Sequence, residues 1–440
     1  MQVQGGMTTS HSPSFLRSFR LSAREELVPL VRELLEAEGF RFEPEPFSPL
    51  CFRLLEEPFP LGSSLAAFFG YIYIQDRSSM LPPLALNPAR GATVVDVCAS
   101  PGSKTGLLAQ LVGEEGFVLA NEISHARLNT LRMTLKACNC IQVGTCSYSG
   151  DALPLRPGSC QAILLDPPCS GWGTVEKNPH VLDVWHEGKV QPLITLQRRL
   201  LARAASLLAD DGVLVYSTCT TNSDENELQV CYAEEELGLV RDPIEPFAGF
   251  VWDDRAGSEG TLRVDGTRSK AQGFYIARLR KKAQAVPSSS AAMGTDLEQG
   301  QAQKAVQKGT GGCDVSRAQL ATATVQPDLL PDGRCAVFSG TVRFLPRASE
   351  TFLPDGFVWQ GAPLGRLGSG GFQADARLRV CMQPSSQAIV LQEPGEVRSL
   401  LSGASMRTDL RGKEAGLWWR DLPLGRVSLR NGRVIAGFGK

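Results

Sequence analysis

The stretch from residue 93 to residue 112 most constrains what this chain can fold into. Residues 93–97 are apolar or β-branched and predict a short, buried strand. A turn of small residues follows, in which Pro101 fixes the backbone and Gly102 is expected to let it approach a ligand. Residues 103–112 have helical composition. A strand, a tight turn and a helix N-terminus in this order predict a pocket for a nucleotide-like ligand.

Three kinds of nucleotide-like pocket are candidates for this turn, and the patterns of two of them are missing. A dinucleotide fold requires Gly-x-Gly-x-x-Gly, which is absent, and a phosphate loop requires Gly-Lys, whereas Ser103 separates Gly102 from Lys104. An S-adenosylmethionine pocket needs fewer glycines, because it holds no pyrophosphate. An ordinary strand-to-helix turn without a ligand is the fourth interpretation, and this stretch alone does not decide between the last two.

The whole chain has room for two or three domains, with 440 residues of which 42% are hydrophobic. Its formal net charge of −1 excludes a global field that attracts nucleic acid, so any polyanion site must be a local patch. The twelve cysteines follow neither disulfide nor zinc spacing, which favours a reducing compartment. The N-terminus lacks a signal peptide pattern, and no apolar run approaches the ~20 residues of a membrane span. We expect a cytoplasmic protein without a membrane contact.

Residues 89–282 alternate between strand and helix patterns and predict an α/β fold with a doubly wound, Rossmann-like sheet. The predicted strands are 93–97, 117–121, 141–146, 162–165, 212–216 and 272–279, the last antiparallel at the sheet edge. Glu122 follows the second strand, where a carboxylate suits ribose hydroxyls, and Asp151 follows the third, where it could meet an adenine.

Two further strand ends carry chemistry. Asp166-Pro-Pro-Cys169 presents an acid and a thiol on a stiff backbone, and Cys219 ends the neighbouring predicted strand. Two such thiols could be a redox pair, half of a metal site, or catalytic. A redox pair favours Cys-x-x-Cys spacing, and no histidine neighbours these cysteines in sequence, so we predict no metal.

A catalytic thiol fits best with a methyl donor. Cytosine C5 is not nucleophilic, but addition of a thiolate to C6 makes C5 able to attack a methyl sulfonium. The step needs an acid near N3, which Asp166 could supply or relay, and then a base that removes the C5 proton. The residues themselves do not decide which thiol attacks, and an isolated cysteine is more often a small buried hydrophobe.

Three motifs, in this order and spacing, resemble the RNA cytosine-C5 methyltransferases of the RsmB/RsmF/NSUN group: Cys98-Ala-Ser-Pro-Gly-Ser-Lys104, Asp166-Pro-Pro-Cys169 and Ser217-Thr-Cys219. The resemblance covers about residues 15–282. It implies S-adenosylmethionine-dependent methylation of cytosine C5 in RNA. It also implies that Cys219 is the nucleophile and that Cys169 assists product release. From the chemistry of the reaction, we also predict that Asp166 is catalytic. The donor pocket that it implies comprises Cys98, Ala99, Ser100, Pro101, Gly102, Ser103, Lys104, Glu122, Asp151 and Asp166.

Flanking regions complete the predicted layout. Residues 1–88 are expected to form a short helical, RNA-binding region, with an amphipathic helix within 14–39 and a strand at 68–74. Residues 283–325 have the composition of a flexible linker. Residues 326–440 predict a small β-rich domain.

The end of the chain favours an RNA partner. Residues 397–440 hold nine Lys or Arg and three Asp or Glu, together with Trp418 and Trp419. Such a surface suits RNA, although a small β core explains the tryptophans equally well. Residues 419–433 resemble the PUA-like C-terminal domain of RsmF-type enzymes, which favours ribosomal RNA over transfer RNA as substrate. The alternatives are an amino-methyltransferase and a non-catalytic ribosome-assembly factor. We expect a monomer.

Overall fold

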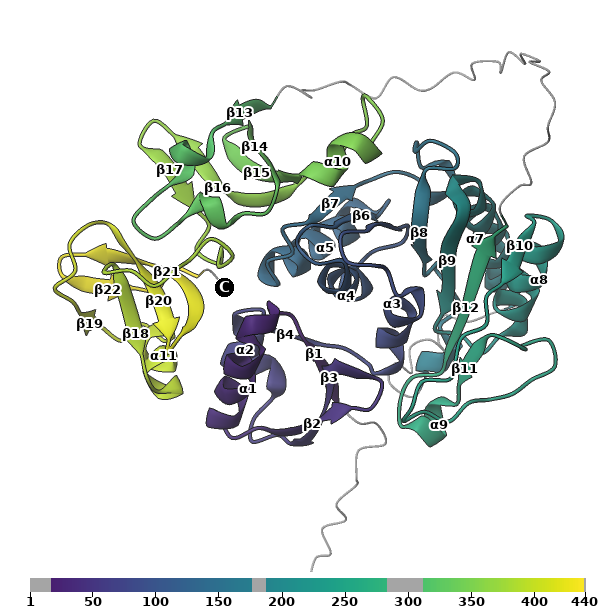
Figure 1. Ribbon diagram of the computed structural model, residues 1–440. Helices are drawn as coiled ribbons and strands as arrows, with labels where there is room; N and C mark the ends of the chain where they lie inside the picture. The colour runs from purple at the N-terminus through teal and green to yellow at the C-terminus, as the bar shows by residue number, and fades with distance from the viewer. Residues whose placement is uncertain (1–16, 176–186, 283–311, 439–440) are drawn as a thin grey trace, which may run out of the picture.

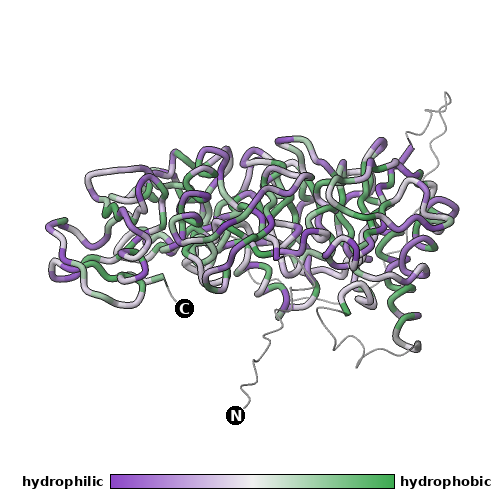
Figure 2. The backbone as a smooth tube through the Cα atoms, turned by 90° about the horizontal axis from the view of Figure 1, so that it is seen from below, coloured by the Kyte–Doolittle hydropathy of each residue, from purple (hydrophilic) through white to green (hydrophobic). Residues whose placement is uncertain are grey.

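The computed structural model describes residues 17–175, 187–282 and 312–438. Most of the predicted linker, residues 283–311, lies outside the described residues. Four units are arranged in a ring: an N-terminal unit, a central α/β core, and two β units (Figure 1). Viewed at a right angle, they make one elongated, flattened body with hydrophobic segments running through its middle (Figure 2).

The core contains an eight-stranded sheet in the order β10-β12-β9-β8-β5-β6-β7, with β11 paired to β12. Its strands are β5 (Thr93–Asp96), β6 (Phe117–Asn121), β7 (Val143–Cys146), β8 (Cys160–Leu165), β9 (Leu208–Thr218), β10 (Leu239–Arg241), β11 (Leu262–Val264) and β12 (Phe274–Lys281). Its helices are α3 (Leu81–Leu86), α4 (Ser103–Val112), α5 (His125–Ala137), α7 (Glu187–Leu207), α8 (Glu227–Glu235) and α9 (Gly266–Ser269). The five strands from β5 to β9 are parallel. Two separate apolar clusters pack the helices of the core against the sheet. The predicted Rossmann-like core is confirmed.

One strand of the core differs from the prediction. Strand β12 is antiparallel as expected, but β10 pairs along its far side and takes the edge. Strand β10 has three residues, too few to carry a recognisable alternation of polar and apolar side chains. Its pairing with β12 is visible only in the folded chain.

The N-terminal unit is a mixed α/β unit with a four-stranded sheet, so the prediction of a short helical region with a single strand is corrected. It contains β1 (Ser18–Leu21), α1 (Val28–Ala37), β2 (Arg41–Glu45), β3 (Ser48–Glu56), α2 (Leu65–Phe68) and β4 (Ile72–Ile74), with the sheet order β2-β3-β1-β4. Pro44 lies within β2, which is an edge strand, so its missing N–H group costs no hydrogen bond inside the sheet. The strand predicted at 68–74 is shorter in the structure, since α2 ends at Phe68 and β4 begins only at Ile72.

The C-terminal region holds two five-stranded sheets, where the sequence predicted one small domain. The first contains β13 (Cys313–Val315), β14 (Gly333–Phe338), β15 (Thr341–Pro346), α10 (Arg347–Phe352), β16 (Ala362–Gly368) and β17 (Gly371–Ala374). The second contains β18 (Ala388–Leu391), α11 (Pro394–Leu401), β19 (Met406–Arg407), β20 (Glu414–Trp419), β21 (Leu422–Arg430) and β22 (Arg433–Ile435). Strand β13 lies in the predicted linker. Its first two residues are exposed and it pairs with β14 through its backbone, which composition does not reveal.

The second β unit packs against the N-terminal unit, and the two share one apolar cluster. Trp419 is fully buried in this cluster, and Trp418 is 4% exposed. The Tyr71 hydroxyl donates a hydrogen bond to the Pro423 carbonyl, and Arg398 forms an ion pair with Glu38. Both tryptophans are therefore buried, and they do not form an exposed RNA-stacking surface. In the part of the chain that the structure describes, no helix is long and apolar enough to cross a bilayer.

The first β unit is attached to the open edge of the core sheet. Thr145 of β7 and Gln360 form an antiparallel bridge with two backbone hydrogen bonds of 2.8 Å. The Trp359 ring lies 5.7 Å from the Phe117 ring, centroid to centroid, over the position where Gly144 has no side chain. The bridge covers β7, an edge that would otherwise expose unpaired backbone groups.

Substitution of Gly144 by alanine is expected to weaken this attachment. A Cβ atom at Gly144 would lie 2.6 Å from the Trp359 ring, so the ring must move. We expect the free energy of unfolding to fall by about 1–3 kcal/mol, as for other overpacked cores. Thermal unfolding measures the effect, and Gly368→Ala is the control, since no atom lies within 4 Å of its added Cβ. Equal melting temperatures for the two variants would contradict the predicted steric cause.

Candidate active site

The predicted site residues lie at the carboxyl ends of the parallel strands, as expected. Residues 97–102 follow β5, Glu122 follows β6, Asp166 follows β8, and Cys219 follows β9. Because these strands are parallel neighbours, the segments that leave them meet at one edge of the sheet. The side chain of Asn121 connects three of them, since its amide nitrogen donates to the carbonyls of Val97 (3.1 Å) and Tyr148 (3.0 Å).

The turn after β5 is braced by the first turn of α5. Arg127 Nη2 donates to the Ser100 carbonyl (3.0 Å), and Ser100 Oγ donates to the Arg127 carbonyl (3.0 Å). Gly102 has a φ of +101°, which favours glycine. A Cβ atom there would lie 3.0 Å from Leu131 and 3.2 Å from Thr134. Its crowded side therefore faces α5, and close packing against that helix is a second reason for glycine at this position, besides the expected approach to a ligand.

Negative charge converges on this turn. Burial raises the pKa of the Cys98 thiol, and the charges of Asp96, Asp166 and Glu122 raise it further. Burial also raises the pKa of Asp96 to about 7, against the hydrogen bond that Thr105 Oγ1 donates to its carboxylate (2.7 Å). Sequence reasoning missed Asp96; the only signal was a carboxylate that ends an otherwise apolar strand. An environment of this kind suits a cationic ligand.

Glu122 and Asp151 lie at the same edge of the sheet, Glu122 after β6 and Asp151 after β7. Glu122 is 4% exposed, and its Oε1 accepts a hydrogen bond from the Ser124 N–H group (2.9 Å). Asp151 lies in the short 3-10 helix Gly150–Ala152 and pairs with Arg199 of α7 at 3.0 Å. This short helix lies against the turn after β5, since a Cβ atom at Gly150 would be 2.9 Å from the Val97 side chain.

Lys104 and Asp166 form an ion pair of 2.7 Å between α4 and the end of β8. Ser217 Oγ donates to the other carboxylate oxygen of Asp166 (2.7 Å). Burial alone would lower the pKa of Lys104, but the charge of Asp166 and the hydrogen bond to it outweigh burial and raise this pKa. The Lys104 ammonium also lies 5.1 Å from the centre of the Phe274 ring, a contact that the sequence did not predict.

The two predicted thiols are brought together. The sulfur atoms of Cys169 and Cys219 are 3.3 Å apart, although the residues are 50 positions apart in sequence. A hydrogen bond from Cys169 lowers the pKa of Cys219, and the positive charge of Lys104 acts in the same direction against burial and Asp166. The same hydrogen bond, together with burial, raises the pKa of Cys169 well above its usual range. The positive charge of Lys104 thus favours the thiolate form of Cys219.

A buried carboxylate that the sequence did not single out holds the two thiol-bearing loops together. Glu225 is fully buried and accepts hydrogen bonds from the Ser170 N–H group (2.9 Å) and from Gln197 (3.0 Å). Ser170 Oγ also lies 2.8 Å from Thr220 Oγ1. Each thiol is thus followed by a residue that binds across to the other loop. Only the polar composition of residues 222–226 hinted at this role.

Replacement of Cys169 by alanine is expected to raise the pKa of Cys219. The variant loses the hydrogen-bond donor that stabilises the Cys219 thiolate. The rate of Cys219 alkylation by iodoacetamide, followed by mass spectrometry as a function of pH, should therefore begin to rise at a higher pH than in the wild type. Cys231→Ala, which removes a half-buried thiol of α8, is the control and should leave this profile unchanged. A profile unchanged in Cys169→Ala would contradict the predicted thiol–thiolate bond.

Within the described ranges, no group of three or more His, Cys, Asp or Glu side chains is arranged to hold a metal ion. Three of the four histidines, His11, His180 and His186, lie outside these ranges.

Comparisons with known proteins match this core. A family model described as 16S rRNA methyltransferase RsmB/F matches residues 83–280. Ribosomal RNA small subunit methyltransferase F of Cronobacter sakazakii is 37% identical over 281 residues, which are 62% of this chain and 58% of that protein. The protein of the same name from Escherichia coli O9:H4 (strain HS) is 36% identical over 283 residues, with the same two shares. The chain thus spans less than two thirds of the length of these relatives.

Solved structures agree with the sequence matches. A methyltransferase homolog protein from Pyrococcus horikoshii is 31% identical and has a TM-score of 0.53, covering 61% of this chain and 87% of its own. NSun6 from the same organism has a TM-score of 0.53 at 21% identity, covers 62% of this chain and 92% of its own, and supports the fold alone. With the motifs at one edge of a Rossmann-like sheet, these matches show that the chain belongs to the RsmB/F family of methyltransferases.

Proposed function

We propose that this protein methylates C5 of cytosine in ribosomal RNA, with S-adenosylmethionine as the methyl donor. The observation that carries the proposal is the pair of thiols 3.3 Å apart beside the Lys104–Asp166 ion pair. Membership of the RsmB/F family supports it. The names of the curated relatives favour ribosomal RNA over transfer RNA as the substrate.

The residues at the sheet edge fit the donor. When bound, S-adenosylmethionine supplies a methyl group on a positively charged sulfur. The converging charges of Asp96, Asp166 and Glu122 favour a cation at the turn formed by residues 98–104. Glu122 follows the second parallel strand and would accept hydrogen bonds from the ribose hydroxyls, and Asp151 would contact the adenine.

Cys219 acts as the nucleophile on the base. Its thiolate forms a bond to C6 of cytosine, and the electron pair of the C5–C6 double bond moves into the ring. Asp166 supplies or relays a proton to N3, and the adjacent Lys104 holds its carboxylate in place. C5 is then electron-rich and would take the methyl group, with the electron pair of the broken sulfur–methyl bond staying on the sulfur of the demethylated donor, S-adenosylhomocysteine.

Cys169 acts in product release. Once C5 carries both a methyl group and its original proton, Cys169 removes this proton, and the electron pair re-forms the C5–C6 double bond as the Cys219 thiolate leaves. The raised pKa of Cys169 suits a group that stays protonated while Cys219 attacks. To act as the base, Cys169 would first lose its own proton to solvent, and the proton taken from C5 would then restore the thiol. Glu225 positions both thiols through Ser170 and holds the loops in register.

The flanking units have proposed roles in RNA binding. The N-terminal unit and the C-terminal β units, the latter containing a PUA-like domain, would hold the RNA around the core. We propose a cytoplasmic monomer as the working form. Light scattering coupled to size-exclusion chromatography tests its mass, for which the single chain is 47.5 kDa.

The activity is tested directly with the full chain. The protein is incubated with methyl-labelled S-adenosylmethionine and unmodified small-subunit ribosomal RNA, and nucleosides from the digested RNA are analysed by mass spectrometry. We expect 5-methylcytidine. Methylation of an exocyclic amine instead would favour an amino-methyltransferase, and binding of RNA without any transfer would favour an assembly factor.

A further inference from the structure

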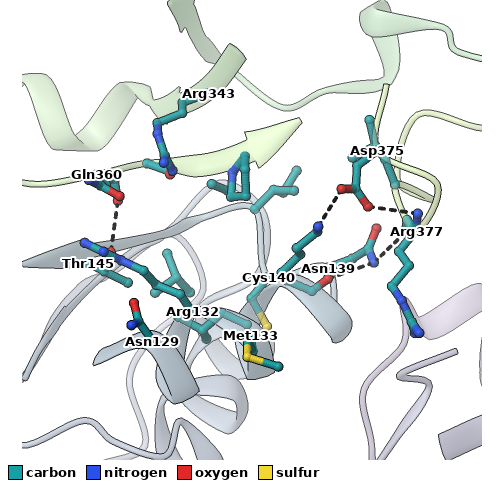
Figure 3. A pocket seen from close by; sticks show the side chains of 18 residues that line it. Asn129, Arg132, Met133, Asn139, Cys140, Thr145, Arg343, Gln360, Asp375 and Arg377 are labelled. Carbon is teal, nitrogen blue, oxygen red and sulfur yellow. Dashed lines mark hydrogen bonds and ion pairs between the residues drawn. The ribbon is translucent and has the colours of Figure 1, made fainter. Parts of the chain in front are cut away.

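A second pocket lies away from the thiols, between the core and the first β unit. It is a cavity of about 460 Å³ bordered by α5 and β7 on one side and by β15, the segment 360–363 and the end of β17 on the other (Figure 3). Neither the turn after β5 nor the thiol-bearing loops contribute to its lining. Its volume is in the range of pockets that bind small organic molecules.

Two cations of this cavity have no carboxylate partner among the described residues. Arg132 of α5 donates to Thr145 Oγ1 (3.0 Å), and Arg343 of β15 donates to the Gly361 carbonyl (2.9 Å), both of which are neutral acceptors. The nearby Lys136, in contrast, forms an ion pair of 2.5 Å with Asp375. Burial and the charge of Arg132 lower the pKa of Arg343, so the two cations repel one another across the pocket. A bound anion would relieve this repulsion.

The rest of the cavity has the features that a nucleobase requires. Its walls are largely apolar and include Val143 and Pro363. The side-chain amides of Asn129 and Gln360 line the same space, as Figure 3 shows, and neither has a hydrogen-bond partner in the part of the chain that the structure describes. Amide side chains both donate and accept, and so suit the polar edge of a base.

The helix that borders the cavity, α5, also contacts the proposed donor pocket through its first turn. Arg127 in the first turn of α5 contacts the turn after β5, and Arg132 lies five residues further along, a rise of about 8 Å. Asn129, Arg132 and Lys136 recur at three- and four-residue spacing, so they share the face of α5 that borders the cavity.

We propose that this cavity between the core and the first β unit binds one nucleotide of the RNA substrate, with a phosphate between Arg132 and Arg343 and the base against the apolar wall. The choice of RNA as the source of the nucleotide rests on the proposed function. The site would lengthen the RNA contact beyond the reacting cytosine and thereby contribute to the selection of the target sequence.

The double variant Arg132→Gln/Arg343→Gln tests the proposal in the full chain. The probe is a transcript of small-subunit ribosomal RNA, and its binding is measured without methyl donor by filter retention at several salt concentrations. We expect roughly tenfold weaker binding and a slope of log affinity against log salt that is reduced by about 1. In methyl transfer, KM for RNA should rise while kcat stays within about twofold, since no thiol-site residue is changed.

The matched control is Arg90→Gln/Lys282→Gln, which removes the same charge from exposed positions of the core at the sheet edge opposite the thiols. Equal weakening in both double variants would overturn the proposal, because it would indicate only a general loss of positive charge. Unchanged binding in the cavity variant would overturn it as well.

A measurement on the wild type keeps the test independent of whether the variants fold. The same transcript, substituted with 4-thiouridine, is irradiated in complex with the protein, and cross-linked peptides are identified by mass spectrometry. We expect cross-links within residues 129–145 or 360–363, and their absence would overturn the proposal. Since binding and cross-linking require no methyl transfer, this result is separate from failure of the proposed activity, which the wild-type transfer assay reports.

Discussion

Cys169→Ala protein, incubated with S-adenosylmethionine and ribosomal RNA, is expected to accumulate a covalent protein–RNA complex. The variant retains Cys219, which attacks C6, but lacks the group that removes the C5 proton, so elimination of Cys219 slows by roughly 10²–10⁴-fold. A denaturing gel shows the complex as a band of low mobility that ribonuclease treatment collapses. Sequencing of the trapped RNA identifies the methylated position.

Cys219→Ala provides the decisive comparison. Loss of the nucleophile should abolish the band and lower methyl transfer by roughly 10³-fold or more. Cys231→Ala, a substitution of a thiol outside the site, should behave like the wild type in both assays. Methyl transfer at a normal rate by Cys219→Ala would contradict the thiol mechanism and would support the alternative of an amino-methyltransferase.

Asp166→Asn is expected to produce the second-largest loss. The carboxylate accepts hydrogen bonds from Lys104 and Ser217, each at 2.7 Å, and its charge acts on both thiols. Asparagine keeps the shape but neither carries the charge nor relays a proton. We expect kcat to fall by roughly 10²–10⁴-fold with a smaller change in KM for the donor. The rate of adduct formation in a Cys169→Ala background measures the affected step.

The Asp151→Asn variant distinguishes an effect on the chemical step from an effect on donor binding. Asp151 also carries a carboxylate in an ion pair, with Arg199 at 3.0 Å, but it lies at the donor side of the sheet edge. Its neutralisation should raise KM for S-adenosylmethionine more than it lowers kcat. If Asp166→Asn and Asp151→Asn had the same kinetic signature, the assignment of a proton-transfer role to Asp166 would be wrong.

The arrangement of the four units in a ring affects how RNA would be held. The second β unit shares an apolar cluster with the N-terminal unit, and the first β unit is hydrogen-bonded to the edge of the core sheet. Each unit is thus tied to its neighbour by buried contacts. RNA bound across several units would meet a preformed surface, which reduces the ordering cost of binding.

The core and the location of its site were determined by the sequence alone, because their signals are local. Buried parallel strands have short apolar runs, and the turn at residues 98–102 has the small residues that such a turn needs. Parallel strands also place the residues after them at one edge, so Glu122, Asp166 and Cys219 could be grouped without coordinates. Motif order then supplied the family resemblance.

Only the tertiary structure decided what depends on pairing between distant segments. The 3.3 Å contact of Cys169 with Cys219, the bonds of buried Glu225 to the thiol loops, and the N-terminal sheet all join residues far apart in sequence. The cavity of Arg132 and Arg343 exists because the segment around Gln360 extends the edge of the core sheet. Hydrophobic periodicity specifies which side chains are buried, but the register of long-range strand pairing, and with it the meeting of these groups, is set by packing of the whole chain.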